Sequence, residues 1–302
     1  MNLDAYGRSQ THTLGPALLV VLAGLLPPGV SHAAPPAATP QGDPLLPVPG
    51  GCFTMGRDEG GEPDERPAHR VCVSPFRLDR TEVTREAYLQ CVAAKQCPAP
   101  RELGKRFSRP RQPVVGVTWD AARAYCQWVG KRLPTEAEWE FAARGPEGRE
   151  FPWGSTPPDP SRAAFGWQAN GPDDVGSHPA GAGPFGHLDL GGNVWEWVAD
   201  VYHPGYYARS PERDPPGGTC DEALAFCREL AAQGRRGYTG SNPIPTICER
   251  VLRGGAWNYN GPGLRATNRV HHGPGFRIQV AGFRCAADAE PPPPPPPPPT
   301  AK

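Results

Sequence analysis

The first half of the chain carries short stretches in which apolar and polar residues alternate. Residues 70–73 and 76–79 alternate in this way and predict two strands. The runs 53–56 and 114–117 are short and apolar, and each predicts a further strand. The pattern therefore indicates a fold whose sheets are built from strands of only a few residues.

Apolar residues at helical spacing follow three threonines in this half, and each threonine is a suitable helix N-cap. The caps are Thr84, Thr118 and Thr135. The first helix is predicted over 86–94, the second to end before Gly130, and the third to end at Gly145. Glu138 completes a capping box with Thr135, which fixes the start of the third helix.

Helical periodicity nearly disappears after Gly145, where Gly, Pro, Asn and Asp dominate. One further helix is predicted over 222–233. Loops this long inside a compact domain are usually functional, or they need disulfides or bound cations to hold them.

Proline and glycine together account for 79 of the 302 residues, a fraction near that of disordered chains. The prolines are unevenly placed, with nine in the first 50 residues and nine more at 291–299. Residues 47–287 are therefore expected to form one loop-rich domain, preceded by a Pro-rich linker at 34–46. Residues 288–302 form a polyproline tail that cannot join a packed core and is expected to be disordered.

The N-terminal 33 residues have the features of a secretory signal peptide. Arg8 precedes a ten-residue apolar run at 17–26, and small residues at 31–33 suit a cleavage site. Ten helical residues cover about half of a bilayer core, so no stable membrane span is expected after cleavage. A buried core helix is the alternative, but the linker that follows disfavours it. The protein is expected to be exported, and the periplasm, the cell surface and the medium stay open.

Charge and cysteine content agree with export. Acidic and basic residues balance at 31 each, so a nucleic-acid partner is not expected. None of the nine cysteines forms a CxxC pair, and in an oxidising compartment such a set indicates disulfides with at least one thiol left over.

Five motifs stand in order along the chain. They are Leu78–Thr84, Gly130–Glu140, Gly191–Trp197, Arg253–Trp257 and Gly282–Cys285. Together they resemble the formylglycine-generating enzyme family, also called sulfatase-modifying factors, over roughly residues 47 to 287. The resemblance implies an α+β fold with little regular secondary structure, a variant of the C-type lectin-like fold.

The resemblance fails where the family has its two active-site cysteines, which bind copper and attack the substrate cysteine. Tyr259 and Leu264 stand at those positions, and Ala256 replaces the family serine. Neither Tyr259 nor Leu264 can supply the thiolate that copper(I) and covalent attack require. Copper is therefore not expected, and the chain is expected not to make formylglycine by the family mechanism.

A calcium site is also implied by the resemblance. The family ligand positions correspond to Asp189, Gly192, Val194 and Glu196, with Asp189 in place of an asparagine. Carboxylate and carbonyl oxygens suit calcium, which would hold the loops. Alternatively, Glu196 only pairs with an arginine, and the neighbouring tryptophans belong to the core.

Three disulfides can be argued. Cys126 and Cys285 match a bridge of the family. Cys91 and Cys97 lie across the end of the first helix, and Cys52 and Cys72 lie on neighbouring strand candidates. Cys220, Cys227 and Cys248 remain, and only two of these can pair.

A ligand groove is expected where the family binds its substrate peptide. Its candidate residues are Trp257, Asn258, Tyr259, Asn260, Arg265 and Arg269. Aromatic and arginine side chains are frequent interface anchors, although Trp257 alternatively belongs to the core. We expect a calcium-supported module that binds an exported protein or peptide. The alternatives are an oxidoreductase of the formylglycine-generating type that uses unfamiliar residues, other chemistry on the same scaffold, or a structural cell-surface protein.

Overall fold

Short strands and loops make up most of the structure, a computed structural model that describes residues 44–167, 170–235 and 244–289. The helices of these residues are α1 (Arg85–Ala93), α2 (Trp119–Trp128), α3 (Glu136–Arg144) and α4 (Cys220–Ala232). The strands are β1 (Leu45–Val48), β2 (Gly51–Met55), β3 (His69–Val73), β4 (Phe76–Asp79), β5 (Trp195–Val201), β6 (Arg250–Arg253), β7 (Arg269–His272), β8 (Ala281–Gly282) and β9 (Ala286–Asp288). Single 3-10 turns occur at η1 (Pro63–Glu65), η2 (Lys105–Phe107), η3 (Pro179–Gly181) and η4 (Gly261–Leu264). The fold is thus α+β with little regular secondary structure, as predicted.

The helix predictions are confirmed because the capping side chains act as expected. The hydroxyls of Thr84, Thr118 and Thr135 each accept a hydrogen bond from the backbone N–H three residues on. The fourth helix begins two residues before its predicted start. Thr219 caps it and forms a second capping box with Glu222.

The strand predictions at 53–56, 70–73 and 76–79 correspond to β2, β3 and β4, whereas the one at 114–117 is wrong. Val114 donates its N–H to Val83, and Gly116 donates to Ile278, so the segment has no single partner strand. Gly116 also has a positive φ of 73°, which interrupts an extended run. These apolar residues fill the core from a loop.

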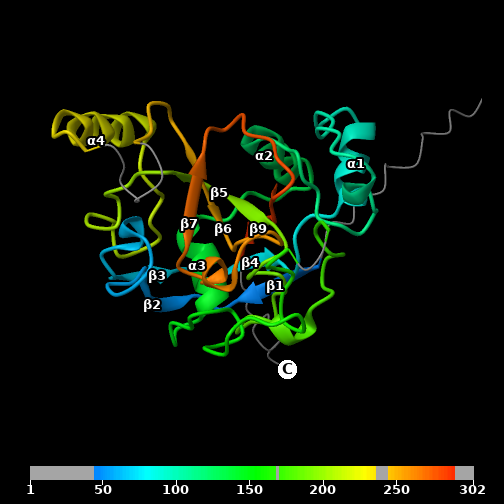
Figure 1. Ribbon diagram of the computed structural model, residues 1–302, viewed down its shortest axis with the longest axis horizontal. Coiled ribbons are helices and arrows are strands. Elements are labelled where there is room, and N and C mark those ends of the chain that lie inside the picture. The colour runs from blue at the N-terminus through cyan, green and yellow to red at the C-terminus, as the bar shows by residue number, and fades with distance from the viewer. Residues whose placement is uncertain (1–43, 168–169, 236–243, 290–302) are drawn as a thin grey trace, which may run out of the picture. The chain divides into compact units, whose positions relative to one another are not determined.

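The strands form three small sheets within the described residues. β4 lies between β1 and β9, β2 and β3 form a hairpin, and β5 and β6 are the central strands of a four-stranded sheet, with the order β7-β6-β5-β8. All pairs are antiparallel except β5 with β8. Helix α3 contacts both the β2–β3 hairpin and the central strands β5 and β6 (Figure 1). It therefore joins two of the three sheets.

Helix α3 is almost wholly buried, including its charged residues. Phe141 packs on Phe53 of β2 with ring centroids 5.3 Å apart, and the Trp139 indole is fully buried against the central sheet. A second apolar cluster surrounds α2, where Tyr125 packs against Tyr88 and Phe283. The two clusters give the loops a common core.

All three expected disulfides are present, namely Cys52–Cys72, Cys91–Cys97 and Cys126–Cys285. Cys220 pairs with Cys248, which leaves Cys227 as a buried free thiol. The Cys126–Cys285 bridge connects α2 to the segment between β8 and β9.

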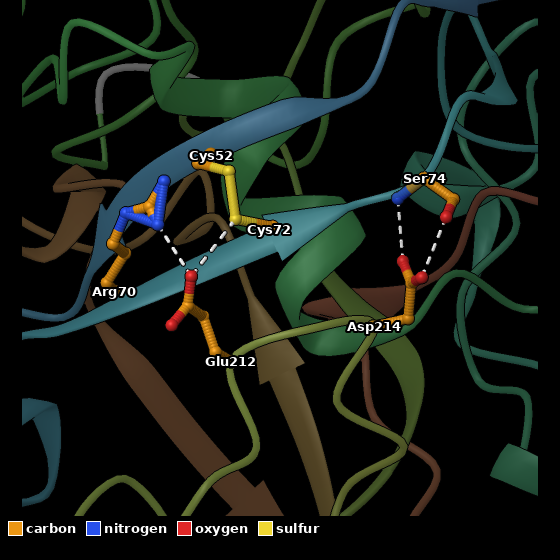
Figure 2. The surroundings of a disulfide bond; sticks show 6 residues. All are labelled: Cys52, Arg70, Cys72, Ser74, Glu212 and Asp214. Atoms are coloured by element: carbon orange, nitrogen blue, oxygen red, sulfur yellow. Dashed lines mark hydrogen bonds and ion pairs between the residues drawn. A yellow bond between two sulfur atoms is a disulfide. The ribbon is translucent and has the colours of Figure 1, made fainter.

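The Cys52–Cys72 bridge lies beside a loop that is tied to β3, as Figure 2 shows. Glu212 accepts a hydrogen bond from Arg70 at 2.6 Å, and its backbone carbonyl accepts the N–H of Cys72. Asp214 accepts two hydrogen bonds from Ser74, one from its N–H and one from its hydroxyl. The loop thus adds a partner to the free edge of β3.

The strands of the described residues run from Leu45 in β1 to Asp288 in β9. The predicted signal peptide, most of the linker and the proline run lie outside the described residues. No helix in the described part of the chain has the length and apolarity needed to cross a membrane.

Candidate functional site

The segment after β6 turns sharply and opens the region where the groove was predicted. Gly254 and Gly255 both have positive φ, and a Cβ on Gly255 would lie 2.9 Å from the carbonyl oxygen of Gly263. Glycine is therefore required for the close approach of this turn to η4. The chain then runs through Tyr259 and η4 before it enters β7.

A buried network of charges supports this segment from below. The guanidinium of Arg269 in β7 donates two hydrogen bonds to the carboxylate of Glu136 in α3, at 2.7 and 2.9 Å. Arg253 lies 3.0 Å from the same carboxylate and also pairs with Glu140. Burial alone would raise the pKa of Glu136, but the two guanidinium groups outweigh burial and lower it. The network therefore fixes β6 and β7 against α3 as charged partners.

Asp200 of β5 lies beside this network, and its pKa shifts in the opposite direction from that of Glu136. It accepts the backbone N–H of Glu136 at 2.7 Å. Burial and the charge of Glu136 raise the pKa of Asp200 to about 8. This carboxyl group is therefore protonated over much of the neutral range.

Three recesses lie along the segment from Tyr259 to Arg265. The first, of about 520 Å³, is bounded by this segment and by the residues of β7. The second, of about 540 Å³, shares Pro262 and Arg265 with the first and extends to Arg57. The third, of about 520 Å³, shares Tyr259 and Asn260 with the first. Because neighbouring recesses share lining residues, they are adjacent, and we call the three together the η4 groove.

The structure places five of the six predicted groove residues in this lining. Asn258, Tyr259 and Asn260 line the third recess, and Tyr259, Asn260, Arg265 and Arg269 line the first. Arg269 is nevertheless only 3% exposed, because its guanidinium is used by Glu136. Trp257 was a groove candidate with a core position as the alternative, and it is part of the core, at 1% exposure. Its indole N–H donates to Gln279, which keeps the ring inside.

Tyr259 and Leu264, at the two positions that carry cysteines in the family, pack against neighbouring apolar side chains. The Tyr259 ring packs edge to face on Trp195, with centroids 5.2 Å apart. Leu264 is fully buried and packs with Phe151 and Ala163. Cys227 is the one free thiol among the described residues, and it lies in α4. The groove therefore has no thiolate pair that could bind copper(I).

A histidine on β7 is a groove residue that the sequence analysis did not select. His271 lines the first recess, and its Nδ1 lies within hydrogen-bonding distance of the Glu249 carboxylate. Tyr202 stacks on the imidazole with centroids 3.7 Å apart. Glu249 is adjacent to Cys248 of a disulfide, but it is 22 residues from His271 in sequence, so nothing local indicated the pair.

The four residues predicted to bind calcium lie in and before β5. Asp189 has a φ of 59° and accepts the N–H of Gly176 at 2.6 Å. Both carboxylate oxygens of Glu196 accept hydrogen bonds from Arg284, each at 2.7 Å, and the Trp139 indole donates to one of them at 2.9 Å. The arginine partner considered for Glu196 is therefore Arg284, and Trp195 and Trp197 are core residues.

Carboxylates gather around Asp189, but among the described residues no group of three or more His, Cys, Asp or Glu side chains is placed to hold a metal ion. Glu82, Asp189 and Glu196 bring three buried carboxylates to one guanidinium, that of Arg284. Both side-chain oxygens of Glu82 are buried, and the carboxyl group lies beside that of Asp189. Burial, and then the charge of Asp189, raise the pKa of Glu82 well above its ordinary value. A cation held by carboxylate and carbonyl oxygens would relieve this excess of negative charge.

Residues 30–289 match the model of the sulfatase-modifying factor enzyme 1-like domain. The chain belongs to this family. It is 32% identical to the formylglycine-generating enzyme of Streptomyces coelicolor, with 87% of this chain and 95% of the relative covered. It is 30% identical to the inactive C-alpha-formylglycine-generating enzyme 2 of Mus musculus, with 96% and 98% covered.

Longer proteins also carry this domain. The chain is 36% identical to the serine/threonine-protein kinase pkn1 of Chlamydia caviae over 79% of its own length, but it spans only 37% of that relative. Among solved structures, PvdO from Pseudomonas aeruginosa has a TM-score of 0.61 and 26% identity, with 81% of this chain and 94% of that one covered. The fold is thus that of formylglycine-generating enzymes, and relatives named as active and as inactive are similar to the chain to nearly the same degree.

Proposed function

We propose that this member of the sulfatase-modifying factor family is exported, does not oxidise cysteine, and binds a peptide or protein segment in the η4 groove. The observation that carries the proposal is the filling of both cysteine positions. Tyr259 closes one position against Trp195, and Leu264 is buried at the other. Without a thiolate pair, copper(I) has no soft ligands and the covalent step has no nucleophile.

The groove itself supports the binding role. It comprises three adjacent recesses, formed by loops that lie over buried ion pairs. Its surface includes an aromatic ring, amide side chains and Arg265, which is the mixture common at interfaces that bind peptides. Arg265 is held by Glu65 at 2.8 Å, so little side-chain entropy is lost when a ligand meets it.

The calcium ion belongs to the same proposal as a structural element. Asp189, the carbonyls of Gly192 and Val194, and Glu196 would hold it, and Glu82 supplies a further carboxylate beside them. When bound, the ion would neutralise part of the buried negative charge and tie the loop before β5 to the sheet. The groove would then rest on a stiffer support.

Export is supported by the disulfides. Eight of the nine cysteines are paired, which suits an oxidising compartment. The apolar run at 17–26 would direct the chain there.

A displayed peptide library selected on the mature chain tests the binding role. We expect peptides whose affinity falls roughly tenfold in a Tyr259→Ala, Asn260→Ala variant, because anchors at the centre of an interface carry most of the binding energy. Leu89→Ala is the matched control, since Leu89 is a similarly exposed apolar residue on α1. Equal binding to all three proteins would refute the groove as the binding site. Copper-dependent turnover of a Cys-x-Pro-x-Arg peptide would refute the non-oxidising role.

A further inference from the structure

Two large exposed rings lie together at one end of the η4 groove. Four large hydrophobic side chains are exposed among the described residues, and two of them, Trp167 at 67% and Tyr259 at 37%, line the same recess. Gly166, Asn258 and Asn260 complete it. We call this set the aromatic platform. Exposed apolar rings gathered in one recess indicate a surface that a partner covers.

The platform is held in place and is not a frayed loop. Trp167 donates its backbone N–H to Trp257 at 3.0 Å, and Gly166 donates to Tyr259 at 2.6 Å. The Trp167 ring meets the buried Trp257 ring edge to face, with centroids 5.1 Å apart. Trp167 also has a φ of 62°, which is unfavourable for a bulky residue and persists only where surrounding contacts impose it. The fold therefore presents this indole to solvent.

The platform suits a ligand that offers hydrogen-bond acceptors to its unused donors and apolar rings that can pack on its aromatic side chains. No charged residue lines it. Within the described residues, no hydrogen bond uses the Trp167 indole N–H, the Tyr259 hydroxyl or the side-chain amide groups of Asn258 and Asn260 as donors. A proline segment has carbonyl acceptors and no backbone N–H donors, and aromatic-lined grooves bind such segments in the polyproline II conformation.

The chain carries such a segment itself. Nine consecutive prolines occupy 291–299 and begin three residues after β9 ends at Asp288. β8 pairs with Trp195, whose ring contacts Tyr259, and the eight residues from Ala281 to Asp288, which are seven Cα–Cα steps, span at most about 25 Å. Nine prolines in polyproline II extend about 28 Å, so the run can reach the platform of its own chain.

We propose that the proline run 291–299 docks on the aromatic platform of the same chain and competes with external ligands for this end of the η4 groove. The competition rests on the proposed function, but the docking does not. Tethering gives the tail an effective concentration in the millimolar range, so even a weak site would be largely occupied. The tail would then act as a built-in competitor that a stronger ligand displaces.

The test compares the intact mature chain with a variant in which 291–299 is replaced by a Gly/Ser segment of equal length. A nine-proline peptide is titrated into each while tryptophan fluorescence and its quenching by iodide are recorded. We expect the peptide to bind the Gly/Ser variant roughly tenfold more tightly than the intact chain, because the tethered tail competes. Iodide should also quench the variant more strongly, since the Trp167 indole is then uncovered.

Two substitutions in the Gly/Ser variant locate the site. Trp167→Ala should reduce the affinity for the nine-proline peptide roughly tenfold, whereas Leu89→Ala should leave it unchanged. Equal affinity of the intact chain and the Gly/Ser variant, or no effect of Trp167→Ala, would overturn the proposal. Association of the intact chain into dimers that require the tail would also overturn it in favour of docking between copies. Library peptides that fail to bind while the proline peptide binds would refute the proposed function alone.

Discussion

Arg284 and Glu196 form a doubly hydrogen-bonded ion pair in the interior, with both contacts at 2.7 Å and neither side chain exposed to solvent. The two residues come from separate sequence motifs, 88 positions apart. Arg284 also donates to the carbonyls of Asp79, Arg80 and Leu188, so one guanidinium joins the end of β4, the loop before β5 and β5 itself.

Replacing Arg284 by methionine should therefore destabilise the fold severely. Removing one partner of a buried pair leaves an uncompensated charge, at a cost of about 3–5 kcal/mol in the free energy of unfolding. Urea denaturation measures the loss. Arg70→Met is the control, because the Arg70–Glu212 pair is exposed and should contribute no more than about 1 kcal/mol. Similar losses in both variants would contradict this account of Arg284.

Removing the Cys126–Cys285 bridge should cost more than removing Cys91–Cys97. The first closes a loop with a sequence separation of 159 and the second one of 6. In the chain-entropy account these loops correspond to about 5 and about 2 kcal/mol. Paired serine substitutions and denaturant unfolding give the two values. An equal loss from both would show that loop length does not determine the stabilisation here.

Asp200 should make stability fall as the pH rises through the neutral range. The pKa of Asp200 is raised to about 8 in the folded state, so between about pH 4 and pH 8 the folded chain retains a proton that the unfolded chain releases. This group then lowers the free energy of unfolding by at most about 1.4 kcal/mol per pH unit. Asp200→Asn should remove that slope, which denaturant titrations at pH 5, 6.5 and 8 would reveal. A slope that is unchanged in the variant would rule out Asp200 as its source.

Calcium removal should lower the melting temperature of the wild-type protein, because the ion would no longer offset the carboxylates of Glu82, Asp189 and Glu196. Asp189→Ala should reduce or abolish the effect of a chelator. Asp221→Ala is a suitable control, since Asp221 lies in the first turn of α4, away from this cluster. Identical melting curves with calcium and with chelator would refute a stabilising role for calcium.

Local signals allowed the sequence to predict the helices well. The hydroxyls of Thr84, Thr118 and Thr135 each accept a hydrogen bond from the backbone N–H three residues further along the chain. Caps this local can be recognised without knowledge of the tertiary structure. The segment 114–117 was misassigned because burial from a loop and burial in a strand leave the same apolar pattern. The disulfides were predictable where spacing or the family resemblance constrained them, while Cys220–Cys248 required the structure.

The candidate site was only partly accessible to sequence reasoning. The segment 258–260 could be placed because the motif at 253–257 anchors it, and Tyr259 and Asn260 do line the groove. Trp257 could not be assigned to surface or core, since a tryptophan after a glycine turn suits either. Trp167 and the His271–Glu249 pair depend on contacts between distant segments, which no local pattern encodes.

The buried ion pairs have a consequence for how this protein could be changed. Arg253, Arg269, Glu136 and Glu140 lock α3 to the central sheet with side chains that point away from solvent. Asn258, Tyr259, Asn260 and Pro262 take no part in those pairs, although they lie only a few positions away along the chain. The buried ion pairs and the proposed binding surface thus draw on largely different residues in one short stretch. A library randomised at Asn258 and Pro262, with Asn260 kept as the cap of η4 and Tyr259 kept against Trp195, should retain most of its stability, which would make the domain a starting scaffold for selecting new binding proteins.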